Sequence, residues 1–113
     1  MSQNRNKFLD LFIGNLSNAV LHRILEKAID LPEIVNKYDK EIKNSWEIAK
    51  IYREKINPKN PPFPEKDIDE IRRKIFLKVK SELSIRISRG YKNIDLSLIG
   101  PFIEEALIEM KII

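Results

Sequence analysis

The chain of 113 residues contains no cysteine, a single histidine (His22) and three isolated glycines. Without cysteine there is no disulfide framework, no thiolate metal site and no cysteine nucleophile. One histidine provides too few ligands for a zinc site, and the neighbouring sequence supplies neither a nucleophile nor an orienting partner for a catalytic base. The glycines form no phosphate-binding loop. These absences predict a non-enzymatic protein that needs no metal and no cofactor.

Long uncharged runs are missing as well. The longest one near the N-terminus covers residues 11–21, whereas a membrane-spanning helix needs about 20 apolar residues. Asp10 also interrupts the apolar segment that a signal peptide would require. We therefore expect a cytoplasmic protein without a membrane segment. The many Lys and Glu residues are compatible with a thermophilic source.

By contrast, apolar residues recur at helical spacing over most of the sequence. Apolar residues recur every four residues over residues 6–29 and 68–87, and at heptad spacing over residues 35–56. The last segment, residues 95–113, carries Pro101 near a helix start. We expect one all-α domain over residues 1–113. The predicted architecture is a four-helix bundle whose second and third helices are long, antiparallel and joined by a proline-rich crossover.

Local signals place the helix ends. Four prolines within residues 58–64 must end the second helix and favour an extended polyproline conformation. Asp30 is the expected N-cap of the second helix, and Gly90 is the expected left-handed residue that ends the third. One alternative stays open. Residues 83–99 contain two segments that alternate with period two, so a β-hairpin in an α+β fold also fits this region.

The first helix is apolar over more of its circumference than one side of a bundle needs. Its polar side is narrow, and we expect His22 to form a surface pair there with Glu26. We also expect part of the apolar surface, together with the apolar C-terminus, to be buried against another chain. The residues predicted for such an oligomer interface are Phe8, Phe12, Leu21, Leu25, Ile29, Ile112 and Ile113.

The net charge of +4 is unevenly distributed, because residues 71–93 carry eight basic residues and one acid. This order suits the macrodipole of a helix whose first turns, residues 65–70, are acidic. It is also the one feature that could recognise phosphates or an acidic protein, although the bases do not share one helix face. Arg86 falls near the apolar stripe, so we expect it to pair with Glu104 or Glu105. The candidate binding residues are Arg73, Lys74, Lys78, Lys80, Arg89, Tyr91 and Lys92.

Taken together, these observations predict a small helical protein that acts by protein–protein association. It would work as a homodimer or as a small subunit of a larger assembly. The alternative is a nucleic-acid-binding module that uses the basic segment, residues 72–92.

Overall fold

The computed structural model of the chain describes residues 2–58 and 62–113. Its elements are α1 (Ser2–Ala28), α2 (Pro32–Ile56), α3 (Glu65–Ser88), the 3-10 turn η1 (Leu96–Leu98) and α4 (Ile99–Glu109). The described residues contain no strand, so the all-α prediction is confirmed. The hairpin alternative for residues 83–99 is wrong, because residues 83–88 complete α3. Within the same residues, no helix is long and apolar enough to cross a membrane.

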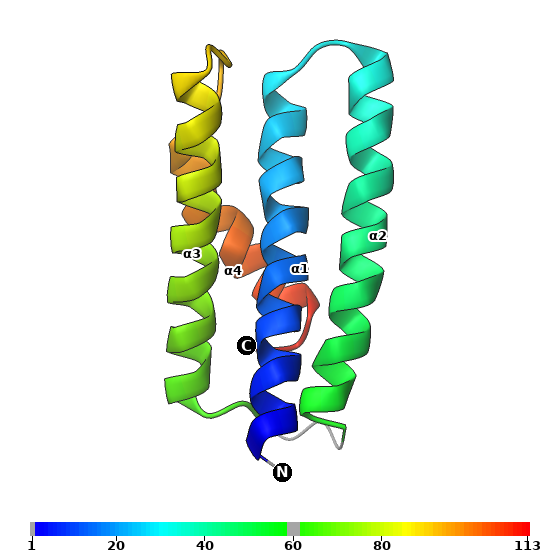
Figure 1. Cartoon of the computed structure of the whole chain (residues 1–113), viewed down its shortest axis with the longest axis vertical. Helices are drawn as coiled ribbons and strands as arrows, with labels where there is room; N and C mark the ends of the chain where they lie inside the picture. Colours follow the sequence, from blue (N-terminus) through cyan, green and yellow to red (C-terminus); the bar gives the residue numbers. More distant parts are fainter. Residues whose placement is uncertain (1, 59–61) are drawn as a thin grey trace.

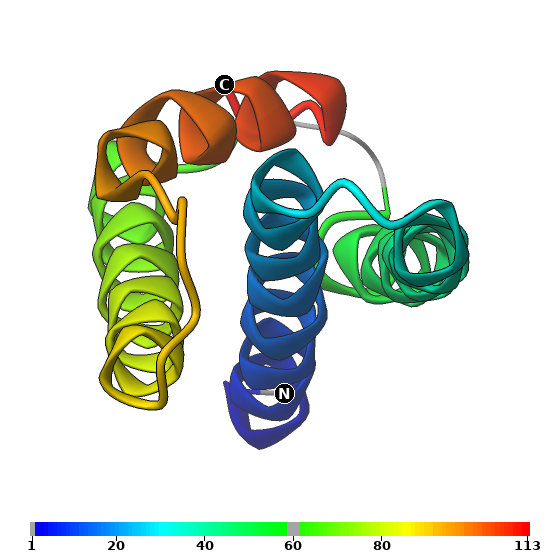
Figure 2. The ribbon, with the colours of Figure 1, turned by 90° about the horizontal axis from the view of Figure 1, so that it is seen from above.

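The other three helices are arranged around α1. In Figure 1, α1 lies between α2 and α3, and Figure 2 shows α4 crossing one side of α1 and α3. The principal contacts join α1 to each of the other helices and α3 to α4. The long helices α2 and α3 are antiparallel, as predicted, but α1 separates them (Figure 1).

Both apolar stripes of α1 are buried within this chain. Phe12, Leu16 and Val20 are fully enclosed, and Leu21 and Leu25 on the second stripe are buried. The apolar excess that indicated another chain is therefore covered by the chain's own helices. This placement corrects the prediction for three of the proposed interface residues, which lie in the core and not at the surface: Phe12, Leu21 and Leu25.

Proline sets the N-termini of α2 and α3. α2 begins at Pro32, whose missing N–H is harmless in a first turn. Its N-cap is Leu31, not Asp30 as predicted, because the Leu31 carbonyl accepts the first helical hydrogen bonds. α3 begins directly after Pro64, with two acids in its first turn. The predicted polyproline crossover lies partly outside the described residues, at 59–61.

Gly90 ends α3, as predicted. Its φ of 97° is in the left-handed region. The Gly90 N–H donates to the Ile87 carbonyl at 3.0 Å and the Tyr91 N–H donates to the Arg86 carbonyl at 3.1 Å. These are the two bonds of a Schellman motif. An added Cβ would have no atom within 4 Å, so the backbone conformation, and not crowding, requires glycine here.

α4 ends in the same motif with a lysine in the left-handed position. Lys111 has a φ of 59°, and its N–H donates to the Ile108 carbonyl at 3.0 Å. The Ile112 N–H donates to the Leu107 carbonyl at 2.9 Å. The turn folds Ile112 into the core, so this predicted interface residue is also buried within the chain.

A buried guanidinium fixes this last turn. Arg53 of α2 is only 4% exposed. Its Nε donates to the Met110 carbonyl at 2.9 Å and its Nη2 donates to the Lys111 carbonyl at 3.1 Å. The Phe63 ring lies 5.1 Å from the guanidinium. A cation at a helix C-terminus interacts favourably with the macrodipole, so Arg53 joins α2 to the end of α4.

The two Schellman turns generate opposite predictions at equivalent positions. Gly90→Ala should lower the free energy of unfolding by about 1 kcal/mol, because a Cβ is strained at positive φ. Lys111→Gly should raise it by up to about 1 kcal/mol, because the same strain is removed. Chemical denaturation measures both changes. A neutral Gly90→Ala would contradict the assigned end of α3.

Candidate functional site

The basic part of α3 presents two separate surfaces. Arg73 and Lys80 lie on the side of α4, where the Lys80 Nζ is 5.9 Å from the ring of Phe76. Lys78 lies on the other side and reaches towards Gly14 of α1. The sequence-predicted binding residues therefore do not form one continuous face.

The remaining candidate residues differ in their surroundings. Lys74 is half-buried, and its Nζ lies 3.1 Å from a Glu70 carboxylate oxygen on the same helix. Arg89, Tyr91 and Lys92 are exposed at the end of α3 and just beyond it. Several of the candidate cations have no acidic partner within residues 2–58 and 62–113; these are Arg73, Lys78, Lys80, Arg89 and Lys92.

Among the arginines of α3, the one that pairs with another helix is Arg72. Its Nε and Nη2 donate to the two Glu104 oxygens at 2.8 Å each, and this bidentate bond raises the pKa of Arg72. The prediction that Arg86 pairs with Glu104 or Glu105 is wrong. The Arg86 Nη1 donates instead to Glu82 of its own helix at 3.0 Å. The physical reason is that α4 brings Glu104 next to residues 69–77 of α3.

An apolar groove lies between α3 and α4. Its volume is about 360 Å³, and its apolar lining comes from Phe76, Leu77, Gly100 and Ile103. Phe76 is 38% exposed and Leu77 is 53% exposed. The groove is bordered by charged side chains: Asp69, Arg72, Arg73 and Glu104.

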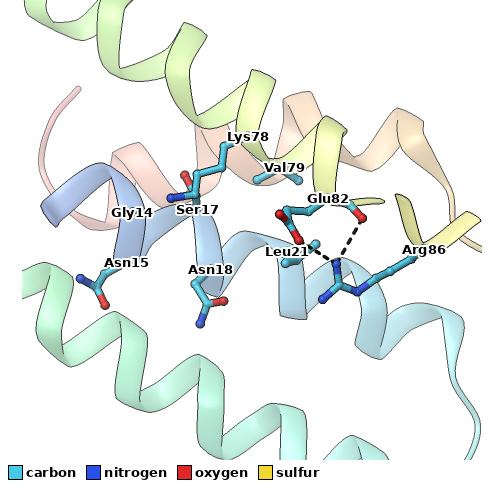
Figure 3. Close-up of a pocket in the computed structure, with 9 residues that line it drawn as sticks. All are labelled: Gly14, Asn15, Ser17, Asn18, Leu21, Lys78, Val79, Glu82 and Arg86. Carbon is cyan, nitrogen blue, oxygen red and sulfur yellow. Dashed lines mark hydrogen bonds and ion pairs between the residues drawn. The ribbon is translucent and has the colours of Figure 1, made fainter. Parts of the chain in front are cut away.

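A second, polar cleft lies between α1 and α3. Figure 3 shows Lys78, Glu82 and Arg86 reaching from α3 over the α1 residues that line the other wall. Its volume is about 420 Å³. The α1 wall consists of Gly14, Asn15, Ser17, Asn18 and Leu21.

Polar residues also join α1 to α2. His22 is buried, with Nδ1 2.8 Å from the Asn18 carbonyl and Nε2 2.6 Å from the Glu41 carboxylate. The predicted surface pair between His22 and Glu26 is therefore wrong, because that face of α1 packs on α2. The Asn18 side chain donates to Ser45 of α2 at 2.6 Å. These bonds position α1 and α2 relative to each other.

Glu26 and Asp39 place two carboxyl groups against each other between α1 and α2. Burial raises the pKa of Glu26 above its ordinary value of 4.5, and Asp39 raises it further, while Lys27 and Arg23 act in the opposite direction. The Glu26 Oε2 is enclosed, and no donor from the described residues reaches it. A hydrogen bond between the two carboxyls therefore needs a proton on one of them.

The other predicted interface residues are partly accessible. Phe8 is half-buried, with its ring centroid 5.9 Å from that of Tyr52. Ile29 is also half-buried, and Ile113 is exposed. They lie at different places on the molecule, and the predicted set does not make one surface.

Two features were not anticipated from the sequence. Phe76 and Leu77 are apolar residues outside the core stripe of α3, which was a usable signal for the apolar groove. The polar cleft gave no comparable signal, because it depends on which faces of α1 and α3 oppose each other. In the part of the chain that is described, no group of three or more His, Asp or Glu residues is placed to hold a metal ion.

Comparison of this chain with models of known protein families, with curated proteins and with solved structures found no match. Function must therefore be inferred from the surfaces described above.

The Glu26–Asp39 pair predicts a pH-dependent effect on stability. Because the folded state raises the pKa of Glu26, ionisation of Glu26 disfavours folding, and its stabilising effect as a neutral group is lost as pH rises through the raised pKa. Glu26→Gln should therefore be more stable than the wild type at neutral pH. The difference should shrink as pH falls through the raised pKa towards 4.5.

Thermal or chemical denaturation over a pH series measures this difference. Glu105→Gln removes one negative charge from an exposed position on α4 and serves as the control. A stability gain from Glu26→Gln that stays constant from neutral to acid pH would contradict the assigned carboxyl pair.

Proposed function

We propose that this chain acts without catalysis, by associating with another protein chain through the groove between α3 and α4. The observation that carries this proposal is the exposure of Phe76 and Leu77 beside Ile103 of α4. Apolar and aromatic side chains gathered in a groove are the anchors on which protein interfaces depend. The partner is a second copy of the chain or a component of a larger assembly.

The charges around the groove favour a partner with acidic residues at its rim. Arg73 and Lys80 are exposed and have no acidic partner in the described part of the chain, whereas Arg72 is held by Glu104. Acids on the partner would meet these two cations, fix the orientation of the complex and accelerate association. Apolar contact would supply most of the affinity.

Leu77→Arg and Ile51→Arg form a matched pair of variants for this proposal. The two residues have similar exposure, 53% and 55%, but Leu77 borders the groove and Ile51 lies on α2. We expect Leu77→Arg to weaken association about tenfold or more, the usual effect of losing a central apolar anchor. Ile51→Arg should have little effect.

The measurement depends on the partner. If the partner is a second copy, light scattering over a concentration series will show a dimer for the wild type and Ile51→Arg, but not for Leu77→Arg. If the partner is a different protein, the chain will be a monomer. A photo-cross-linker at position 77, but not at position 51, will then capture one defined partner. The proposal would be contradicted if the two variants had the same oligomeric state in light scattering and positions 77 and 51 gave the same cross-linked products.

The alternative function is nucleic-acid binding. The observation in its favour is the exposed Tyr91 next to Arg89 and Lys92, because a base can stack on an aromatic ring while cations contact phosphates. We favour it less because Lys78 lies on the opposite side of α3 from Arg73 and Lys80, so the bases do not form one track.

We expect no binding of labelled single-stranded or duplex oligonucleotides at about 150 mM salt, where phosphate contacts are already weakened. Fluorescence anisotropy measures this directly. Binding at that salt concentration that weakens when Lys74, Lys78 and Arg89 are all changed to Gln would favour the alternative over protein association.

A further inference from the structure

The polar cleft between α1 and α3 contains an unsatisfied buried hydroxyl. Ser17 is 2% exposed, lines the cleft, and its Oγ has no hydrogen-bond partner in the described part of the chain. A serine inside a helix can bond the carbonyl four residues earlier, but Ser17 does not. Leaving a buried hydroxyl unbonded costs about 1–3 kcal/mol. The Oγ is enclosed, so a partner within the cleft has to displace the atoms that cover it in order to remove that penalty.

A positive charge lies over the same part of the cleft. The Lys78 Nζ is 3.6 Å from the position that a Cβ would take on Gly14, so the ammonium group reaches across to the backbone of α1. Figure 3 shows this side chain extending towards Gly14 and Ser17. No acid among the described residues pairs with Lys78. A Cβ at Gly14 would be in ordinary van der Waals contact with this ammonium group.

The other charged residues of the cleft neutralise each other. Arg86 and Glu82 form an ion pair at 3.0 Å (Figure 3), so the net charge of the lining is that of Lys78. Leu21 and Val79 add apolar side chains to the same lining. A cleft of about 420 Å³ is within the usual size of a small-molecule site.

We propose that the α1–α3 cleft binds a small molecule that carries an oxyanion, either a carboxylate or a phosphate. The oxyanion accepts hydrogen bonds from the Lys78 ammonium and the Ser17 hydroxyl, and charge-assisted bonds of this kind are the stronger ones. Leu21, which keeps a small exposed area, contacts the apolar part of an organic ligand, whereas Val79 is fully buried. This site lies on the opposite side of α3 from the groove proposed for protein association, so the two proposals are independent.

Titration of the full chain with hexanoate and with inorganic phosphate, followed by backbone amide chemical shifts, tests the site. We expect saturable shifts at Ser17, Lys78 and Val79. Lys78→Met should weaken binding about tenfold, the loss of one charge-assisted bond, and Ser17→Ala should weaken it several-fold. Lys80→Met removes the same charge from the other side of α3 and should leave binding unchanged.

Each outcome of the titration is informative. Binding of either ligand that depends on Lys78 and Ser17 supports the site, and tighter binding of hexanoate assigns a role to Leu21. Ser17→Ala should also leave the ligand-free protein as stable as the wild type or more stable, because it removes the unbonded hydroxyl. Two results would overturn the proposal: no saturable shift with either ligand, or equal weakening by Lys80→Met and Lys78→Met.

Discussion

Burial of α1 around most of its circumference is the constraint on which the other contacts depend. α2, α3 and α4 all pack on α1, and the large side chains of α1 that lie in the core are almost completely enclosed. A helix that is apolar on nearly every side must be surrounded to be stable in water. Here the chain itself supplies the surrounding helices. One side of α1 keeps polar residues, and these residues line the cleft between α1 and α3.

This arrangement determines which surfaces are available for binding. The apolar stripes of α1 are used inside the chain, so the association that we propose relies on outer apolar residues of α3, Phe76 and Leu77. The α1–α3 side is polar, because Ser17 and Lys78 both line the cleft there and the Lys78 ammonium group lies near the backbone of Gly14. Arg53 donates hydrogen bonds to the carbonyls at the end of α4, and the turn that follows buries Ile112. The apolar groove between α3 and α4 and the polar cleft between α1 and α3 lie on different sides of α3.

The elements of the fold followed from local signals in the sequence, which is why they could be predicted. Proline fixes the starts of α2 and α3, and Gly90 ends α3 by a conformation that other residues adopt with strain. The four-residue periodicity of α3 was also a better guide than the local alternation in residues 83–99. The alternating residues Ile85 and Ile87 are exposed on the helix α3 and do not line a sheet.

The side-chain pairings could not be predicted in the same way, because they depend on where distant helices cross. His22 pairs with Glu41 of α2 and not with Glu26 of its own helix, and Arg72 rather than Arg86 meets α4. The apolar excess of α1 was read correctly as a need for burial. Whether another chain or three further helices of the same chain would bury it was a question of tertiary arrangement, which periodicity does not contain.

Methyl NMR with a soluble paramagnetic probe, at a concentration where the chain is monomeric, measures whether α1 is buried by the other helices of the same chain. We expect weak relaxation enhancement for the methyl groups of Leu16, Val20 and Leu25 on α1, because they are buried. We expect strong enhancement for Leu77 on α3, which is exposed. If the α1 methyl groups were relaxed as strongly as those of Leu77, α1 would be accessible in the single chain. That result would contradict burial of α1 by the other helices of the same chain. It would indicate instead that α1 forms an interface with another chain.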